Sequence, residues 1–223
     1  MSTTRAYDSA KRAEAARLTR RRILDAARSQ FFECGYHGTT ISALARAAQV
    51  SPQTIYNTFG GKAEVLKAVY DVLLAGDDEP IALNDRPEIA RVRNQSSAPE
   101  TLRAYAAVAR LLFGRVGPLL GVVLAEGAGS DAELAGFLAT IDRERRIGNT
   151  GVVEHLAQKF GLADGLTVER LVDHVWTLTA PDNGDRLVRR CGWSLDAYEH
   201  WLAEGLIAGL SSSRPQPLRR SRR

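Results

Sequence analysis

The sequence predicts an all-α protein, with three short helices near its N-terminus and a larger helical bundle after them. Three observations support this fold class. Apolar residues recur with the helical period along almost the whole chain, and no segment shows the sustained alternation typical of a strand. Capping residues and glycines divide residues 20–75 into short helices. A stretch rich in Asp, Pro, Asn and Ser over residues 76–99 then separates these helices from longer ones.

Local signals place the N-terminal helices. The first helix carries an apolar stripe and ends near Gly35, because glycine favours helix C-termini. The stripe consists of Ile23, Leu24, Ala27, Phe31 and Phe32. Thr39 or Thr40 caps the second helix, and Ser51-Pro52 opens a short third one that ends near residue 59. Residues 62–75 form a fourth.

The C-terminal part shows helical periodicity in several longer segments. Helices are expected near 99–115, 117–128, 131–160, 167–180, 184–190 and 194–210, with residues 76–99 as a connecting loop. The chain then divides into four parts: a basic flexible arm (1–19), a three-helix domain (20–62), a helical regulatory and dimerisation domain (63–211) and a basic disordered tail (212–223).

Positive charge is concentrated at the two ends of the chain. Residues 1–24 hold seven Arg or Lys against two acidic residues, and residues 214–223 add five arginines and no acid. The remaining residues are acidic, with 18 basic and 24 acidic side chains. Basic ends suit a polyanion, because neutralised phosphates release their counterions. Solvated tails are the alternative interpretation, which we favour for the C-terminal tail.

Composition excludes several classes of protein. The longest apolar run, residues 117–125, is too short to cross a bilayer, and the polar N-terminus does not resemble a signal peptide. Two isolated cysteines, Cys34 and Cys191, fit a reducing cytoplasm and argue against a disulfide scaffold. Neither shows metal-ligand spacing with the four histidines, so we expect a cytoplasmic protein without metal or cofactor.

The spacing of residues 20–59 matches a helix-turn-helix unit. A helix enters the major groove when one face is braced and the other is exposed. Ile55 and Phe59, four residues apart, predict the braced face of the third helix, and Val50 plugs the turn before it. Small residues in the second helix allow close packing: Ala43, Ala45, Ala47 and Ala48. This arrangement predicts a DNA-binding domain.

Two stretches of this unit resemble the signature of the TetR family of transcriptional repressors. They are TISALARAAQVS at residues 40–51 and TIYNTFGGK at residues 54–62. The basic helix before them, with Phe31-Phe32 and the Gly35-Tyr36 turn, is similar too. The resemblance is specific over about residues 20–70. It implies a dimeric DNA-binding regulator, most often a repressor that a small molecule releases from a palindromic operator.

The resemblance also implies which residues contact DNA. They are Thr40, Ser51, Gln53, Thr54, Tyr56, Asn57 and Lys62. Thr40 and Lys62 correspond to phosphate-contacting positions, although Thr40 also serves as a plain helix cap. Tyr56 corresponds to a backbone-contacting tyrosine, and a half-buried core aromatic is the alternative. Many members have glycine at the position of Gln53, which could instead read an adenine.

Enzymatic chemistry has no support in the sequence. A glycine-containing stretch at 120–132 superficially matches a dinucleotide fingerprint but lacks the strand and the βαβ context that this motif needs. Gly60-Gly61-Lys62 lacks the spacing of a phosphate-binding loop. No Ser, Cys or His has neighbours that suggest a nucleophile and base. We therefore predict that the protein is not an enzyme.

The C-terminal block is larger than a dimerisation clamp requires, which favours a small-molecule effector site between its helices. Candidate pocket residues are Tyr105, Phe113, Phe137, His155 and Trp176, each of which could also be ordinary core. The effector is not identified by the sequence. The competing hypothesis is a DNA-binding regulator without an inducer, which acts through protein partners or DNA architecture.

Dimerisation follows from the family resemblance and from the geometry of DNA, since one helix in one groove gives little specificity. The resemblance places the dimer interface on the last two long helices, at about 167–180 and 194–210. The apolar candidates there are Leu171, Val175, Leu178, Trp201, Leu202, Leu206 and Leu210.

Overall fold

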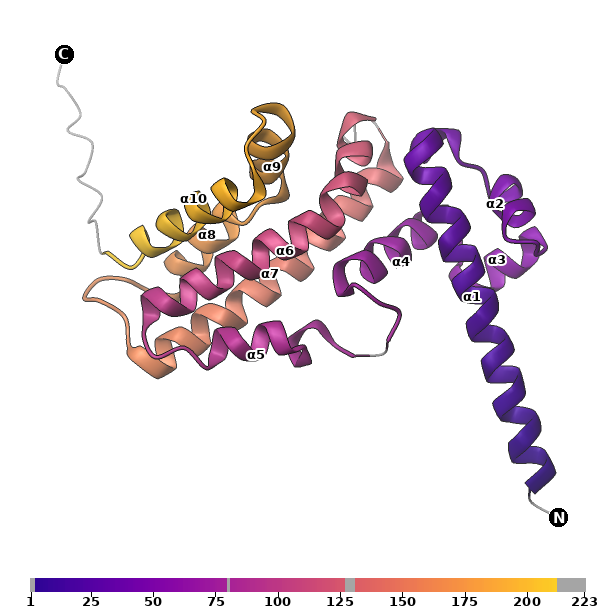
Figure 1. Cartoon of the computed structure of the whole chain (residues 1–223), viewed down its shortest axis with the longest axis horizontal. Helices are drawn as coiled ribbons and strands as arrows, with labels where there is room; N and C mark the ends of the chain where they lie inside the picture. Colours follow the sequence, from indigo (N-terminus) through magenta and orange to yellow (C-terminus); the bar gives the residue numbers. More distant parts are fainter. Residues whose placement is uncertain (1–2, 80, 127–130, 212–223) are drawn as a thin grey trace. The chain divides into compact units, whose positions relative to one another are not determined.

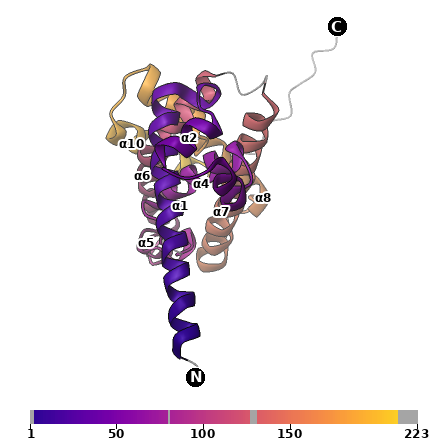
Figure 2. The same cartoon turned by 90° about the vertical axis from the view of Figure 1, so that its right-hand side faces the viewer.

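The computed structural model describes residues 3–79, 81–126 and 131–211, with side chains from residue 11 onward. Every regular element in these ranges is helical, which confirms the all-α prediction (Figures 1 and 2). The elements are α1 (Thr3–Gly38), α2 (Ile41–Ala47), α3 (Pro52–Phe59), α4 (Lys62–Ala75), η1 (Leu83–Asp85), α5 (Pro87–Arg93), α6 (Ala98–Ala125), α7 (Ala132–Phe160), α8 (Val168–Leu178), α9 (Pro181–Gly184), η2 (Asp185–Arg190) and α10 (Leu195–Ala208). The expected tail at 212–223 lies outside the described residues.

The N-terminal helices begin where the sequence signals place them. The Thr40 hydroxyl accepts a hydrogen bond from the backbone N–H of Ala43 at 3.1 Å and so caps α2. Ser51 caps α3 in the same way through the N–H of Thr54, at 3.0 Å, with proline at the first helical position. Gly35 interrupts α1 with a φ of 73°, and the helix resumes for three residues beyond it.

Residues 3–19 differ from the flexible arm that the sequence analysis expected. They form the first half of α1, which continues past α2 and α3 (Figure 1). Five alanines within residues 3–19, and the absence of Gly and Pro between residues 3 and 34, explain the helix, because alanine has the highest helix propensity. The basic charge at the N-terminus is therefore carried on a helix.

Two further elements differ from expectation. α6 is one helix rather than two, and it runs through Pro118. Val116 and Leu119, on either side of that proline, are both buried in the same core, which keeps the helix continuous there. The expected loop at 76–99 contains η1 and α5, because Ile89 and Val92 pack with Val108 in a small apolar cluster.

α6 is also long and apolar enough, by length and composition, to cross a membrane. Its most apolar stretch of 18 residues has a mean hydropathy of 1.7, and 44% of that stretch is buried inside the protein. The run at 117–125 that seemed too short is thus part of a longer apolar helix. Its buried residues, such as Leu102 and Leu120, belong to apolar cores, as in a core helix of a globular protein.

The chain divides into two compact units. Unit 1 comprises residues 1–80 and 114–141, and unit 2 comprises 81–113 and 142–223. This division differs from the expected boundary at residue 62. α4 belongs to unit 1 because Val65, Leu66 and Val69 share a core with α1–α3 and with parts of α6 and α7. Unit 2 has its own core, with Leu102, Leu171 and Leu202 among the fully buried side chains.

Candidate nucleic-acid interface

α3 has one buried and one exposed face, as a recognition helix requires. Ile55 is fully buried and Phe59 half-buried in the core of unit 1, as the spacing predicted. Gln53, Tyr56 and Asn57 are exposed. Tyr56 has an exposed fraction of 49% and does not belong to the apolar core of unit 1, unlike the core aromatic of the alternative interpretation. The exposed face of α3 is therefore polar and free of contacts with the protein core.

Two of the exposed side chains bind each other. The Gln53 amide donates to Oδ1 of Asn57, one helical turn later, at 2.9 Å. This contact orients both amides along the same strip of α3. Gln and Asn amides each match the donor and acceptor edge of adenine, and here the two amides are held in a fixed relation to each other.

The α2–α3 turn is held from α1 by an arginine that sequence reasoning missed. Arg22 donates to the carbonyl oxygen of Ala48 and, at 3.1 Å, to that of Gln49. Gln49 has a φ of 54°, which places it in the left-handed region. Two carbonyls at the C-terminal end of α2 thus bind a guanidinium, which fixes the angle between α2 and α3. The N-terminal arginine cluster was the only sequence signal for this contact.

The side chains of Ser51 and Thr54 take part in the N-terminal cap of α3. Besides accepting from the N–H of Thr54, the Ser51 hydroxyl lies 2.8 Å from Oγ1 of Thr54. Thr40 is exposed and keeps a free oxygen lone pair beside the N-terminus of α2. These three hydroxyls lie at helix N-termini, where backbone N–H groups favour anions such as phosphate.

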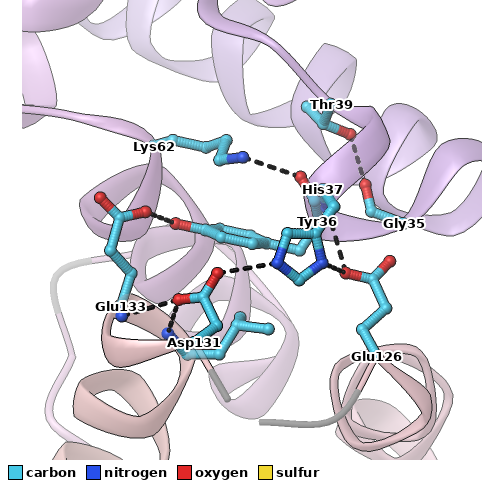
Figure 3. Close-up of polar contacts among 9 residues, drawn as sticks. Gly35, Tyr36, His37, Thr39, Lys62, Glu126, Asp131 and Glu133 are labelled. Atoms are coloured by element: carbon cyan, nitrogen blue, oxygen red, sulfur yellow. Dashed lines mark hydrogen bonds and ion pairs between the residues drawn. The ribbon is translucent and has the colours of Figure 1, made fainter.

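Lys62 has an intramolecular contact that the sequence did not predict. Its ammonium donates to the carbonyl oxygen of Tyr36 at 3.0 Å and lies 4.0 Å from the centre of the Tyr36 ring (Figure 3). The contact joins the start of α4 to the end of α1. An ammonium has three N–H donors, so this arrangement leaves donors for a phosphate while fixing the position of the side chain.

The five candidate pocket residues are not brought together. Phe137 lies in unit 1, edge-to-face with Tyr70 at 5.7 Å between ring centres. The other four lie in unit 2. His155 binds the carbonyl oxygen of Arg93 at 3.1 Å, and Phe113 packs on Tyr198 at 5.5 Å. Phe137 therefore packs in the core of unit 1, and His155 links α7 to the end of α5.

Tyr105 and Trp176 instead join a polar network in the interior of unit 2. The Tyr105 hydroxyl donates to the fully buried Asn149, and burial raises the pKa of Tyr105 to about 12. Asn149 donates to Oγ1 of Thr179 at 3.2 Å. Arg145 also donates to that oxygen, at 3.1 Å, and to the carbonyl of Trp176.

This network contains donors without a partner. Nε of Arg145 and Nε1 of Trp176 are buried and make no hydrogen bond within the described structure. Sequence reasoning could have found Arg145 and Asn149, because they lie four residues apart on the stripe of α7 that continues into Val153 and Leu156. Polar residues on a buried helix stripe indicate a hydrogen-bonded network in the interior, because buried polar groups need partners.

A hollow of about 360 Å³ lies on the surface of unit 2 between α6 and α10. Its lining residues are Arg103, Asp196, Glu199, His200, Ala203 and Glu204. None of the five candidate pocket residues lines it.

The apolar residues expected at a dimer interface divide into two groups. Leu171, Val175, Leu202 and Leu206 are fully buried in the core of their own unit 2, where α8 packs on α10. Only the remaining three of the seven candidates retain exposed surface: Leu178, Trp201 and Leu210.

Comparison with known proteins agrees with this geometry. Residues 23–69, which span α2, α3 and parts of α1 and α4, match the family model described as bacterial regulatory proteins of the tetR family. This part of the chain is thus similar to the DNA-binding domain of TetR-family regulators. The helix-turn-helix class of domain predicted from residues 40–62 is confirmed.

Two similar proteins of Pseudomonas putida match less than half of this chain. TtgW of Pseudomonas putida is 38% identical over 84 residues, which are 38% of this chain and 60% of that protein. SrpR of P. putida is 38% identical over 38% of each chain. The chain thus spans less than two thirds of these relatives. TcmR of Streptomyces glaucescens is 27% identical over 74% of this chain and 75% of its own.

Solved structures of TetR-family regulators share the fold over most of the chain. A regulator from Syntrophomonas wolfei is 16% identical, with a TM-score of 0.68 over 87% of this chain and 96% of its own. FadR of Bacillus subtilis, solved in complex with stearoyl-CoA, is 21% identical, with a TM-score of 0.62 over 84% of this chain and 97% of its own. These likenesses confirm the predicted architecture of an N-terminal helix-turn-helix domain and a larger helical part.

Proposed function

We propose that this protein is a TetR-family regulator, namely a dimeric repressor that occupies a palindromic operator and leaves it when a small molecule binds. The observation that carries the DNA-reading part is α3, with buried Ile55 on one face and exposed Gln53, Tyr56 and Asn57 on the other. Capped helix ends and the Arg22 contact hold this face in place. A rigid frame of this kind suits base recognition, because specific contacts need fixed side-chain positions.

The proposed phosphate contacts are Thr40, Ser51, Thr54, Tyr56 and Lys62. Four of them lie at or within one turn of a helix N-terminus, where the macrodipole and free N–H groups attract anions. The proposed base contacts are Gln53 and Asn57. Phosphate contacts position the protein on the duplex, and base contacts provide its sequence preference.

Gln53→Ala tests the base-reading role. We expect reduced discrimination between the operator and a duplex with one changed base pair, by about 1–3 kcal/mol, because a bidentate amide–base contact is lost. The measurement is the ratio of the two dissociation constants at fixed salt. Gln158→Ala, at an exposed position on α7, is the matched control and should leave the ratio unchanged. A uniform loss of affinity for both duplexes would contradict base reading by Gln53.

Deleting residues 1–19 tests the basic first half of α1. The deletion removes Arg5, Lys11, Arg12 and Arg17, while the buried residues of α1 begin at Ile23 and stay in place. If the segment contacts phosphates, the slope of log affinity against log salt should flatten by about 0.9 for each lost contact. Deleting residues 214–223, which removes five arginines and no acidic residue, is the comparison for loss of positive charge at the other end of the chain. An unchanged slope after the first deletion would show that the segment only solvates the protein.

Dimerisation is proposed through about 167–180 and 194–210. The exposed parts of Leu178, Trp201 and Leu210 support this interface, and a two-fold dimer would match a palindromic operator. Sedimentation of the full chain at about micromolar concentration should give a dimer, in the range of ordinary specific association. A monomer under these conditions would contradict the proposal.

Ligand release is supported by the interior of unit 2. Its buried polar network leaves the Nε donors of Arg145 and Trp176 without partners, and the similar FadR of B. subtilis is solved with stearoyl-CoA. Release requires a ligand that binds more tightly to the conformation with low operator affinity. Thermal-shift screening of metabolites that include stearoyl-CoA, followed by operator binding with each hit, tests this. If every stabilising compound left operator affinity unchanged, ligand release would fail.

A further inference from the structure

The end of α1 is held in unit 1 by a histidine between two carboxylates (Figure 3). Nδ1 of His37 lies 2.7 Å from Oε2 of Glu126, which follows α6. Nε2 lies 2.7 Å from Oδ2 of Asp131, which precedes α7. The backbone N–H of His37 donates to the same Glu126 oxygen at 3.0 Å. Both nitrogens of one imidazole thus face an acidic group, one just after α6 and the other just before α7.

This geometry requires a charged imidazole. A neutral imidazole carries one N–H, whereas an ionised carboxylate only accepts hydrogen bonds. With carboxylates at both nitrogens, loss of one proton turns a hydrogen bond into contact between a lone pair and a carboxylate oxygen. Only the imidazolium satisfies Glu126 and Asp131 together.

The surrounding charges favour the same state. The hydrogen bonds that His37 donates to Asp131 and Glu126 raise its pKa above the usual value of 6.5. The backbone N–H of Leu134, together with His37, lowers the pKa of Asp131. Asp131 also caps α7, because its other oxygen accepts from the backbone N–H groups of Glu133 and Leu134 at 2.8 and 3.0 Å.

The neighbouring Tyr36 links the end of α1 to α7 and α4. Its hydroxyl donates to Glu133 of α7, and the ammonium of Lys62 of α4 lies over its ring. Burial and the carboxylates of Glu133, Asp131 and Glu64 raise the pKa of Tyr36, which keeps the hydroxyl neutral. The acidic groups around this corner therefore outnumber the cations, which favours a protonated His37.

Gly35 allows the Glu126 carboxylate to approach. A Cβ atom at this position would lie 1.7 Å from Oε1 of Glu126, and the residue has a φ of 73°. The same turn leads into α2, since Oγ1 of the buried Thr39 donates to the Gly35 carbonyl at 2.7 Å and Thr40 then caps α2. The contact of His37 thus lies directly before the DNA-reading helices.

We propose that His37 is a proton-dependent latch, whose imidazolium holds the end of α1 on Glu126 and Asp131 and whose deprotonation releases that end and weakens operator binding. The latch orders the turn before α2, so binding DNA costs less ordering entropy while it is closed. The effect on DNA rests on the proposed function; the protonation of His37 does not.

The direction of the pH effect follows from the raised pKa. His37 binds its proton more tightly in the folded protein than in the unfolded chain, so its stabilising effect is complete below about pH 6.5. The effect is lost as the pH rises through the pKa of folded His37. Raising the pH should therefore open the latch.

NMR titration of the His37 ring in the full-length protein tests the latch itself. We expect His37 to titrate above its usual 6.5 and its pKa to fall in the Glu126→Gln, Asp131→Asn double variant, since both opposite charges are lost. Asparagine still caps α7, which protects the fold. Glu154→Gln, at an exposed position on α7, is the control and should leave the pKa of His37 unchanged. Titration of wild-type His37 at or below 6.5, or no change in the double variant, would overturn the proposal.

Operator affinity tests the consequence. The probe is a duplex enriched by the wild-type protein from a randomised pool at low pH. Between about pH 6 and about pH 9, wild-type affinity should fall about two- to fivefold, the size expected for exposed ion pairs, while His37→Gln stays flat. His155→Gln should follow the wild type. An equal pH dependence in wild type and His37→Gln would overturn the latch. If no duplex is enriched, the proposed function fails, and the NMR titration alone decides whether the latch exists.

Discussion

Tyr56→Ala is expected to weaken operator binding by about tenfold or more, because it removes the largest side chain on the exposed face of α3. The ring has an exposed fraction of 49% in the free protein, so its removal opens no cavity in the core. The free energy of unfolding should therefore stay within about 0.5 kcal/mol of the wild type.

Fluorescence anisotropy with a labelled operator measures this effect, and urea unfolding measures stability. Tyr56→Phe separates the ring from the hydroxyl, since it removes only the group that would bind a phosphate. Trp193→Ala, at an exposed aromatic residue of unit 2, is the control and should bind the operator as the wild type does. If Tyr56→Ala bound the operator with wild-type affinity, Tyr56 would not contribute to DNA binding.

Ile55→Ala is expected to have the opposite profile. This neighbour of Tyr56 is fully buried, and truncation of a buried isoleucine destabilises a protein by about 2–5 kcal/mol through lost burial and a cavity. Operator binding should fall as a consequence, since α3 loses the contact that braces it against α1, α2 and α4.

Equilibrium urea unfolding checks this prediction. Ile147→Ala is the matched control, because that isoleucine has an exposed fraction of 66% and its truncation should change stability by less than about 0.5 kcal/mol. Equal stability of the two variants would show that α3 is not braced by Ile55. The two variants therefore distinguish loss of a DNA contact (Tyr56→Ala) from loss of folding stability (Ile55→Ala) at adjacent residues.

The sequence predicts well what local chemistry decides. Thr40 and Ser51 cap α2 and α3 because a hydroxyl before a helix satisfies the N–H groups of its own first turn. Ile55 is buried because its spacing from Phe59 matches the helical period. These signals lie within a few residues, and the family signature at 40–62 lies in the same region, so the helix-turn-helix unit could be predicted almost completely.

Contacts between distant residues could not be predicted in this way. Arg22 binds the turn at Gln49, Lys62 binds Tyr36, and His37 binds carboxylates about 90 residues away. Each pairs residues that only the folded backbone brings together. Pro118 misled the assignment for the related reason that tertiary burial on both sides of it outweighs its local helix-breaking tendency.

The candidate pocket shows the same difference. The large aromatic residues Phe113 and Phe137 were chosen by type, but one packs on Tyr198 and the other on Tyr70. Asn149, which is fully buried and links Tyr105 to Thr179, was passed over because a single polar residue on a helix is usually exposed. A search for polar residues on buried stripes would have found it.

Selection of DNA by the full-length protein from a randomised duplex pool, followed by sequencing, tests the central claim most directly. We predict a two-fold symmetric consensus, with half-sites spaced by about one helical turn of DNA or a multiple of it. Tyr56→Ala should enrich this consensus poorly. A pool without a shared sequence, or a consensus that Tyr56→Ala enriches as well as the wild type does, would contradict recognition of DNA by the exposed face of α3.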